Sequence, residues 1–376
     1  KRQEPHRPTL VSRVDDTPSW PHGVAVSGGI ACVLGYAVSG TGLLQCYDVA
    51  DPAAPAPLGS TGGSGLWPGA AGEMFIAGEV AYIVADEGVV RVGLADRRSL
   101  RRLSTLSWDH WSVRGLTVVE STGYVGGGES PTPVAAQRQG CDTPGPGAGG
   151  ESASCGSATI MRIVDLQGAG SWDEVGRVEP EGDEWGGEVS SAGGKAYMTI
   201  QTVRDPRWVL RAYDVADPGN VRVLGEVGMA ARLAELQLLG RRRELVGGVT
   251  EGGVAIYDMR DPSAPRAAHT ISVPGWRIRG IAALGSSTYI ADNRHGLRIV
   301  DALDPARPQE VGGVVLSAGL LDVAVEDREP AAGGDGETLR LAYGVTRRNL
   351  AVLDVTEPTA ARELGSVELP SAGVAV

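Results

Sequence analysis

One nine-residue stretch decides the fold: YDVADPAAP, at residues 47–55. Close copies return later in the chain: YDVADP at 213–218, YDMRDPSAP at 257–265, VDALDPARP at 300–308 and LDVTEP at 353–358. Weaker copies lie at 93–96 and 164–166. Apart from one longer interval, successive copies are about 43 to 53 residues apart. Self-similarity at such a period is typical of a repeat architecture.

The surroundings of each copy predict four short strands per repeat. A strand of small apolar residues comes first, as at 23–26, and a second follows a glycine turn, as at 288–291. The third strand ends at the Asp of the phrase, and a fourth follows it, as at 308–314. The Asp can accept backbone N–H groups in the turn, while the Pro ends the strand. Four strands in about 45 residues are typical of a propeller blade.

Seven third strands can be counted, ending near residues 48, 94, 165, 214, 258, 301 and 354. We therefore predict an all-β protein, a seven-bladed β-propeller of four-stranded antiparallel blades, with eight blades as the alternative. Segment 229–239 has a helical periodicity, but the repeat register predicts a strand there. We assign residues 1–376 to a single β-propeller domain with a Gly/Pro-rich insertion at 128–158 in blade 3.

Two segments compete to complete the last blade. Residues 10–14 and residues 364–369 both look like a fourth strand, and residues 373–376 repeat the first strand of blade 1. Either end of the chain can therefore close the ring.

The third strands resemble a known family. LRIVD at 297–301 and MRIVD at 161–165 are similar to the LVIVD repeat, which is named for a Leu-Val-Ile-Val-Asp strand. The resemblance extends from about residue 20 to residue 369. It implies a β-propeller and a bacterial or archaeal protein that is secreted or held at the cell surface. The family has no established common activity, so the resemblance implies no active-site motif.

The composition excludes several classes of protein. The chain has 34 Lys and Arg against 46 Asp and Glu, a formal net charge of -12. Without a basic stripe it is a poor nucleic-acid binder, because the phosphate backbone demands clustered cations. No apolar run approaches the roughly 18 residues of a membrane span. The 55 glycines and 23 prolines indicate many turns rather than disorder.

The four cysteines favour an exported protein. Cys141 and Cys155 flank a Gly/Pro-rich loop that cannot bury a core, so we predict a disulfide between them. Such a link would contribute about 3 kcal/mol. Cys32 and Cys46 lie on adjacent expected strands, where a disulfide and two buried thiols fit equally well. The chain begins with Lys1, which a removed signal peptide and a cloning boundary both explain. We expect a secreted, periplasmic or cell-surface location.

The start of each first strand carries the candidate site. Four blades place a carboxylate at one register, and the other three place a glycine there, preceded by a cationic or imidazole side chain. The carboxylates are Glu73, Glu188, Glu235 and Asp322, and the residues before the glycines are His22, Arg114 and Arg279. Because first strands line the channel of a propeller, we expect these side chains to point into one funnel. Channel carboxylates can also serve only to hold water or to pair with arginines.

Most of the tryptophans lie just upstream of first strands. These are Trp20, Trp67, Trp108, Trp111, Trp185 and Trp276, whereas Trp172 and Trp208 lie elsewhere. These tryptophans can either pack in the core between blades or line a binding face. The insertion at 128–158 is expected on the same face, either as a lid over the funnel or as a tolerated surface excursion.

Motifs of familiar enzymes are missing from the sequence. There is no Gly-x-Ser-x-Gly elbow, P-loop or His-Glu-x-x-His, and no Cys-x-x-Cys pair for zinc. We expect no cofactor, although four converging carboxylates could hold Ca²⁺. The leading hypothesis is a non-catalytic module that binds a protein, a glycan or a small polar ligand. The alternative is an enzyme, a lyase, hydrolase or isomerase, with acid and base groups at the channel mouth.

The candidate residues follow from these two hypotheses. For catalysis they are His22, His110, Glu73 and Glu188. For ligand binding they are His22, Trp67, Glu73, His110, Trp111, Arg114, Trp185, Glu188, Glu235, Trp276, Arg279 and Asp322.

Overall fold

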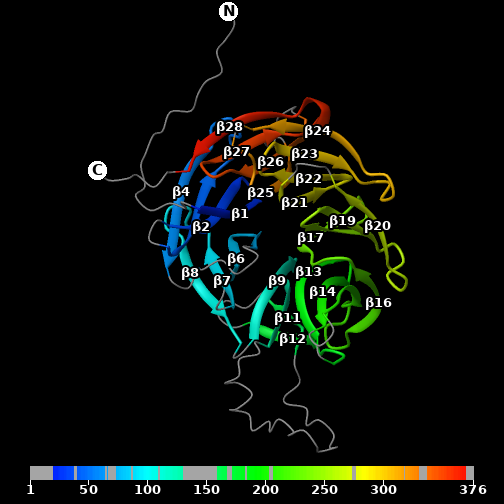
Figure 1. Ribbon diagram of the computed structural model, residues 1–376. Coiled ribbons are helices and arrows are strands. Elements are labelled where there is room, and N and C mark those ends of the chain that lie inside the picture. Colours follow the sequence, from blue (N-terminus) through cyan, green and yellow to red (C-terminus); the bar gives the residue numbers. More distant parts are fainter. Residues whose placement is uncertain are drawn as a thin grey trace, which may run out of the picture.

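Seven four-stranded antiparallel sheets surround a central axis in the computed structural model (Figure 1). The structure describes residues 20–37, 40–63, 66, 73–85, 88–108, 111–129, 159–166, 172–182, 184–202, 206–272, 277–316, 318–329 and 337–369. Within each sheet the strands pair in sequence order, so each blade is one continuous stretch of chain. The predicted seven-bladed propeller is therefore confirmed.

The strand bounds follow the sequence repeat closely. Blades 1 to 3 comprise β1 (Trp20–Ser27), β2 (Ile30–Tyr36), β3 (Gly42–Asp48), β4 (Ala56–Gly63), β5 (Met74–Ala77), β6 (Val80–Ala85), β7 (Gly88–Gly93), β8 (Arg101–Leu106), β9 (Trp111–Val119), β10 (Thr122–Glu129), β11 (Met161–Asp165) and β12 (Asp173–Val178). Blades 4 and 5 comprise β13 (Glu184–Ala192), β14 (Lys195–Thr202), β15 (Trp208–Asp214), β16 (Arg222–Met229), β17 (Ala234–Leu239), β18 (Leu245–Thr250), β19 (Gly253–Asp258) and β20 (Arg266–Ile271). Blades 6 and 7 comprise β21 (Ile278–Leu284), β22 (Ser287–Asp292), β23 (Gly296–Asp301), β24 (Gln309–Val315), β25 (Asp322–Arg328), β26 (Leu339–Val345), β27 (Asn349–Asp354) and β28 (Arg362–Glu368), with a short 3-10 helix, η2 (Pro358–Ala360), before β28.

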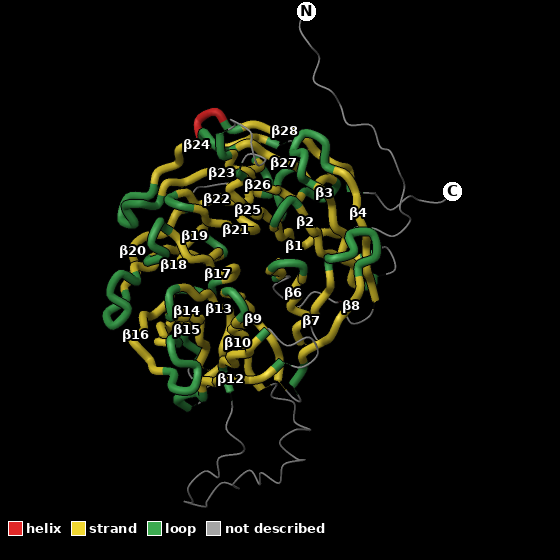
Figure 2. Tube along the Cα trace, turned by 180° about the vertical axis from the view of Figure 1, so that it is seen from behind, coloured by secondary structure: helices red, strands yellow, loops and turns green. Residues whose placement is uncertain are grey.

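Segment 229–239 contains the end of β16 and the whole of β17, so the strand prediction for it is confirmed. The first strands lie nearest the axis, as the view from behind also shows for β1, β17 and β21 (Figure 2). Among the described residues no helix is long and apolar enough to cross a membrane.

The recurring Asp-Pro phrase builds the turn between the third and fourth strands. The first Asp accepts the backbone N–H two residues later, for example Asp48 from Ala50 at 2.9 Å. The second Asp does the same, for example Asp304 from Ala306 at 3.1 Å. These side-chain bonds satisfy backbone donors that would otherwise lack partners in the tight turn. The role expected for the aspartates is thereby confirmed.

Glycines on the fourth strands let neighbouring blades pack closely. They sit at β-bulges in β4, β12, β16, β24 and β28, at Gly59, Gly176, Gly225, Gly312 and Gly365. A Cβ on Gly312 would lie 1.8 Å from the carbonyl oxygen of Pro358 in the next blade. A Cβ on Gly365 would lie 2.7 Å from that of Ala53. The Asp-Pro turn of one blade therefore packs on the bulged glycine of the blade before it.

Within the described residues, blades 7 and 1 meet as two separate four-stranded sheets. β28 completes blade 7, so among the two candidates the segment 364–369 supplies its fourth strand. Residues 10–14 and 373–376 lie outside the described part of the chain. Arg328 of blade 7 donates a hydrogen bond to the carbonyl oxygen of Ala50 in blade 1, at 3.1 Å. Buried apolar residues of both blades, such as Val33 and Val352, form one cluster across this junction.

A disulfide joins Cys32 of β2 to Cys46 of β3. The two residues stand directly opposite each other, with their Cα atoms 4.0 Å apart, and both are buried. This settles the alternative that the sequence left open, in favour of the cross-strand bridge. Cys141 and Cys155 lie outside the described residues, as does most of the insertion, so the disulfide between them stays a prediction.

Candidate functional site

β-bulges near the start of the first strands aim side chains at the channel. The pairing of β1 with β2 shifts register between Pro21 and Gly23, next to His22. In β17 the shift lies between Ala234 and Gln237 and contains Glu235. A bulge leaves a residue unpaired and turns its side chain, which is how strands commonly direct groups into a site. The backbone of Glu235 has φ 52°, a left-handed conformation that a non-glycine residue rarely adopts.

Three of the four predicted carboxylates hold the neighbouring blade. Glu73 of blade 2 accepts the backbone N–H of Leu116 in blade 3, at 2.9 Å. Glu235 of blade 5 accepts that of Ile281 in blade 6, at 3.0 Å. Asp322 accepts the backbone N–H of Val24 in blade 1, at 2.8 Å. It also accepts the backbone N–H of Val323, the residue that follows it in the chain. Each of these carboxylates therefore links two blades at the channel mouth.

The glycines of the same register make these links possible. Each accepted N–H belongs to the residue that follows a register glycine, as Ile281 follows Gly280. A Cβ on Gly280 would lie 2.4 Å from Oδ1 of Asp322 and 3.0 Å from Oε2 of Glu235. A Cβ on Gly115 would lie 2.7 Å from Cα of Glu188. At Gly280 the glycine is thus a packing requirement, because two acidic side chains meet over a residue without a side chain. At Gly115 it is the backbone of the next blade that occupies the space of a side chain.

Glu188 departs from this pattern. The next blade carries Glu235 rather than glycine at the register, and Glu188 is only 2% exposed. Neither of its carboxylate oxygens has a hydrogen-bond partner among the described residues. Its carboxyl lies within hydrogen-bonding reach of the carboxyl of Glu73, where a bond requires a proton between them. A buried acceptor without a donor is costly, so this position demands a proton or another cation.

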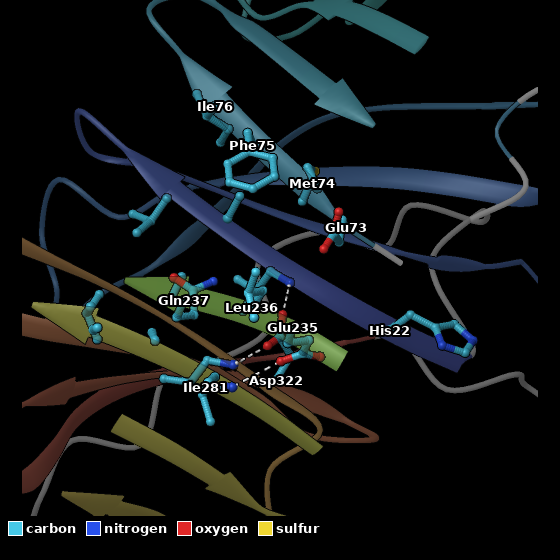
Figure 3. Close-up of a pocket in the computed structure, with 18 residues that line it drawn as sticks. His22, Glu73, Met74, Phe75, Ile76, Glu235, Leu236, Gln237, Ile281 and Asp322 are labelled. Carbon is cyan, nitrogen blue, oxygen red and sulfur yellow. Dashed lines mark hydrogen bonds between the residues drawn. The ribbon is translucent and has the colours of Figure 1, made fainter. Parts of the chain in front are cut away.

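A central cavity of about 250 Å³ opens beside the carboxylates (Figure 3). Its lining comes from the first strands of blades 1, 2, 5, 6 and 7. Polar groups are Glu73, Glu235, Asp322, His22 and Gln237. The rest of the lining is apolar and includes Val24, Val26, Met74, Phe75, Ile76, Ile281, Ala283 and Val325. In Figure 3 Glu73, Glu235 and Asp322 lie in the middle of the view, with His22 to their right and Ile76 and Gln237 to their left.

Burial raises the pKa of all four carboxyls. For Glu73, burial acts first and the charge of Glu188 adds to it. For Glu235, burial acts first and the charge of Asp322 adds to it. Burial raises the pKa of Asp322 to about 7, although two backbone N–H groups oppose the shift. Burial also raises the pKa of Glu188, against the opposing effects of Glu73 and of the Arg232 cation. The surroundings therefore disfavour the charged form of each of these carboxyls.

A second, much smaller cavity of about 10 Å³ adjoins Glu188. Its lining includes Arg114, Trp185, Trp208 and Arg232. The guanidinium of Arg114 lies 4.8 Å from the ring centre of Trp185, a cation–π contact. Burial, and then the charge of Arg232, lower the pKa of Arg114. The space admits about one water molecule, so it is no pocket for a larger ligand.

The predicted single funnel is thus divided between two cavities. His22, Glu73, Glu235 and Asp322 line the central one, and Arg114, Trp185 and Glu188 line the small one. Arg279 is exposed and lines neither of these two cavities. Trp67, His110 and Trp276 lie outside the described residues.

The upstream tryptophans have different environments. Trp111 is 7% exposed and packs in the core between blades 2 and 3, with Trp108 partly buried against it. The core alternative therefore applies to this pair. Trp20 is 60% exposed. Trp172 packs edge-on against Tyr82, away from the channel.

Sequence reasoning missed several lining residues. Trp208 starts β15, which is a third strand, and Arg232 precedes β17. Neither residue occupies the position near the start of a first strand where the sequence has a carboxylate or a glycine. Phe75, the one phenylalanine of the chain, lines the central cavity two residues after Glu73. Side chains two residues apart on a strand point to the same face, so the position of Phe75 relative to Glu73 could have placed it near the channel.

The described residues offer no group of three or more His, Cys, Asp or Glu side chains arranged to hold a metal ion. Calcium takes six to eight oxygen ligands. Here three carboxylates each turn an oxygen toward a backbone N–H. The Ca²⁺ site that the sequence allowed is not tested by these contacts and stays a prediction.

Comparison with known proteins agrees with this architecture. Residues 277–315 match the model of the LVIVD repeat, and they span blade 6. The chain thus carries an LVIVD repeat within a seven-bladed propeller, consistent with the LVIVD-repeat propeller family. No curated protein sequence matches the chain.

Many solved structures align with this chain, and two of them cover most of it. The crystal structure of Saccharomyces cerevisiae Sqt1 aligns with a TM-score of 0.51 at 10% identity, covering 95% of this chain and 97% of that chain. The computationally designed Ika8 protein aligns with a TM-score of 0.49 at 10% identity, covering 89% of this chain and 95% of that chain. At this identity the likeness to Sqt1 concerns the fold alone.

Proposed function

We propose that this chain is a non-catalytic binding module, secreted or at the cell surface, that takes a small polar ligand in the central cavity. The observation that carries the proposal is a cavity already formed, with its carboxylates fixed between blades. Glu73, Glu235 and Asp322 are each held by a backbone N–H of a neighbouring blade. Ligand sites are commonly concave, mostly apolar and equipped with a few fixed polar groups.

The disulfide between Cys32 and Cys46 supports the location. Disulfides persist in oxidising compartments and are rare in the cytosol. This one is buried inside blade 1, where it links neighbouring strands that already pair.

An enzyme is the second candidate, because strongly shifted pKa values in a cavity also occur at catalytic sites. Its acid and base would be Glu73 and Glu188, with His22 on the rim. Two features favour the binding module. One oxygen of Glu73 is occupied by the N–H of Leu116, and Glu188 lines the small cavity rather than the central one.

Thermal-shift measurements with amines, organic acids, neutral sugars and acidic sugars test the proposal, with hits confirmed by calorimetry. Ala283→Leu fills the cavity, while Ala267→Leu makes the same change on the exposed outer strand β20. We expect at least one ligand class to bind the wild type and the Ala267→Leu variant, and to lose binding to Ala283→Leu. NMR should show the ligand unchanged after a day with the protein.

Two results would contradict the proposal. One is that no ligand class binds, or that binding survives Ala283→Leu. The other is conversion of a bound compound into product, which would favour the enzyme.

A further inference from the structure

The central cavity gathers acidic side chains and has few cationic groups to balance them. The three carboxylates that line it share the space with His22, and none of the 18 lining residues is a lysine or an arginine. Glu188, which lines the small cavity together with Arg232, adds a fourth carboxyl that is buried and has no hydrogen-bond donor among the described residues. The charge of Arg232 offsets the effect of burial on this carboxyl only in part. Burying several like charges without compensation is strongly unfavourable. The cluster therefore needs positive charge from protons or from a ligand.

The arrangement of the carboxylates favours an organic cation over a metal ion. No group of three acidic, histidine or cysteine side chains among the described residues is placed to hold a metal. Glu235 uses Oε2 for a backbone N–H, which leaves its Oε1 as an acceptor. Glu73 also uses Oε2 for a backbone N–H, and its carboxyl lies within hydrogen-bonding reach of that of Glu188. An ammonium group accepts looser geometry than a metal, because it needs only hydrogen bonds of about 2.7–2.9 Å to carboxylates.

The rest of the cavity favours a ligand with a carbon body. Apart from His22 and Gln237, the side chains that line the rest of the cavity are apolar and include Phe75, Ile76, Ala283 and Val325. The volume of about 250 Å³ is many times what one water molecule requires, so a small organic ligand has room. Apolar surface gains free energy when it leaves water, so a short alkyl or aryl chain fits where a sugar ring would leave its hydroxyls unpaired.

From this geometry we infer that the ligand of the proposed binding site is a small protonated amine. Its ammonium group lies among Glu73, Glu235 and Asp322, and its carbon body extends along the apolar part of the cavity. The inference rests on the proposed function and narrows it to one chemical class. The amine supplies the positive charge that the carboxyl cluster lacks.

Calorimetric titration at pH 7.5 with n-pentylamine, n-pentanol and pentanoate tests the inference, with CaCl₂ as a fourth titrant. The three organic compounds share one carbon chain and differ in charge. We expect n-pentylamine to bind at least about tenfold more tightly than the other two, and Ca²⁺ to give no binding heat. Glu235→Gln should weaken amine binding at least about tenfold. Glu310→Gln, at a half-exposed pair with Arg298 on the outer strand β24, should leave it unchanged.

A second variant keeps the test meaningful if Glu235→Gln does not fold. Ala283→Leu occupies the cavity and leaves every carboxylate in place, so it should also remove amine binding. The inference is overturned if the alcohol binds as well as the amine, if Ca²⁺ binds in its place, or if both variants retain wild-type affinity.

Failure of the inference is distinguishable from failure of the proposed function. If pentanoate or a sugar binds while the amine does not, the amine inference falls and the binding module stands. If no compound of any class binds, both fall.

Discussion

Asp322→Asn is expected to change how the stability of the protein depends on pH. Burial raises the pKa of Asp322 from 3.8 to about 7. Between these values the folded state keeps a proton that the unfolded state has lost. Stability from this group is therefore fully present below about pH 4 and is lost as pH rises through about 7. Asparagine cannot titrate, so the variant lacks this loss, while its amide oxygen can still accept a backbone N–H.

The size of the effect follows from the pKa. A change from 3.8 to about 7 corresponds to at most about 4 kcal/mol, at 1.36 kcal/mol for each pKa unit. With about 2.1 cal/mol/K of unfolding entropy per residue, a chain of 376 residues would shift by about 5 °C in Tm. This is an upper value, because Asp322 is partly exposed and its charge interacts with that of Glu235.

Other groups around Asp322 also titrate, and the comparison of two proteins removes most of their effect. Glu73, Glu188 and Glu235 have raised pKa values and act in the same direction as Asp322. Burial lowers the pKa of His22, so its contribution has the opposite sign and is lost as pH falls below about 6.5. These groups are present in both proteins.

The assay is thermal unfolding followed by circular dichroism at constant ionic strength, from pH 4 to pH 8. We expect the Tm of Asp322→Asn minus that of the wild type to increase as pH rises, by up to about 5 °C. If this difference in Tm stays constant from pH 4 to pH 8, or decreases, burial does not raise the pKa of Asp322 in the folded protein.

Three further predictions concern stability. Gly280→Ala places a Cβ 2.4 Å from the carboxylate of Asp322 and should destabilise the protein by about 1–3 kcal/mol in urea unfolding. Gly228→Ala, where a Cβ meets nothing within 4 Å, should change the free energy of unfolding by less than about 1 kcal/mol. Equal effects of the two substitutions would contradict the packing argument. Replacing Cys32 and Cys46 with alanine should cost about 3 kcal/mol, and dithiothreitol should lower the Tm of the wild type but not that of the variant. Arg211→Met leaves its buried carboxylate partner in β13 without a cation and should cost about 3–5 kcal/mol in urea unfolding; a change below about 1 kcal/mol would show that the pair adds little.

The blades were predictable because their signal is local. The Asp-Pro phrase encodes a turn through its own side chains, as the bond from Ala50 to Asp48 shows. Repetition of that turn at a regular period determines strand number and order. The β-bulge glycines of the fourth strands were not predicted, because what they accommodate is a carbonyl group of the next blade.

The candidate site was predictable only in part. The shared register brought Glu73, Glu235 and Asp322 to one cavity, because equivalent positions of a repeat meet at the axis. The sequence placed Glu188 and Glu235 at the same register of adjacent blades. It did not show that the other carboxylates accept the N–H that follows a register glycine, so the missing donor of Glu188 was not predictable. Trp111 entered the core instead of the channel because its indole N–H finds the carbonyl oxygen of Thr159 at 2.6 Å.

The most direct test of the central claim is a crystal structure with 4-bromobenzylamine, located by the anomalous signal of bromine. We expect one bromine peak inside the central cavity, near Phe75, with the ammonium nitrogen within about 3 Å of Glu235 and Asp322. A bromine peak only elsewhere on the protein, or a cavity filled by water at saturating amine, would contradict it.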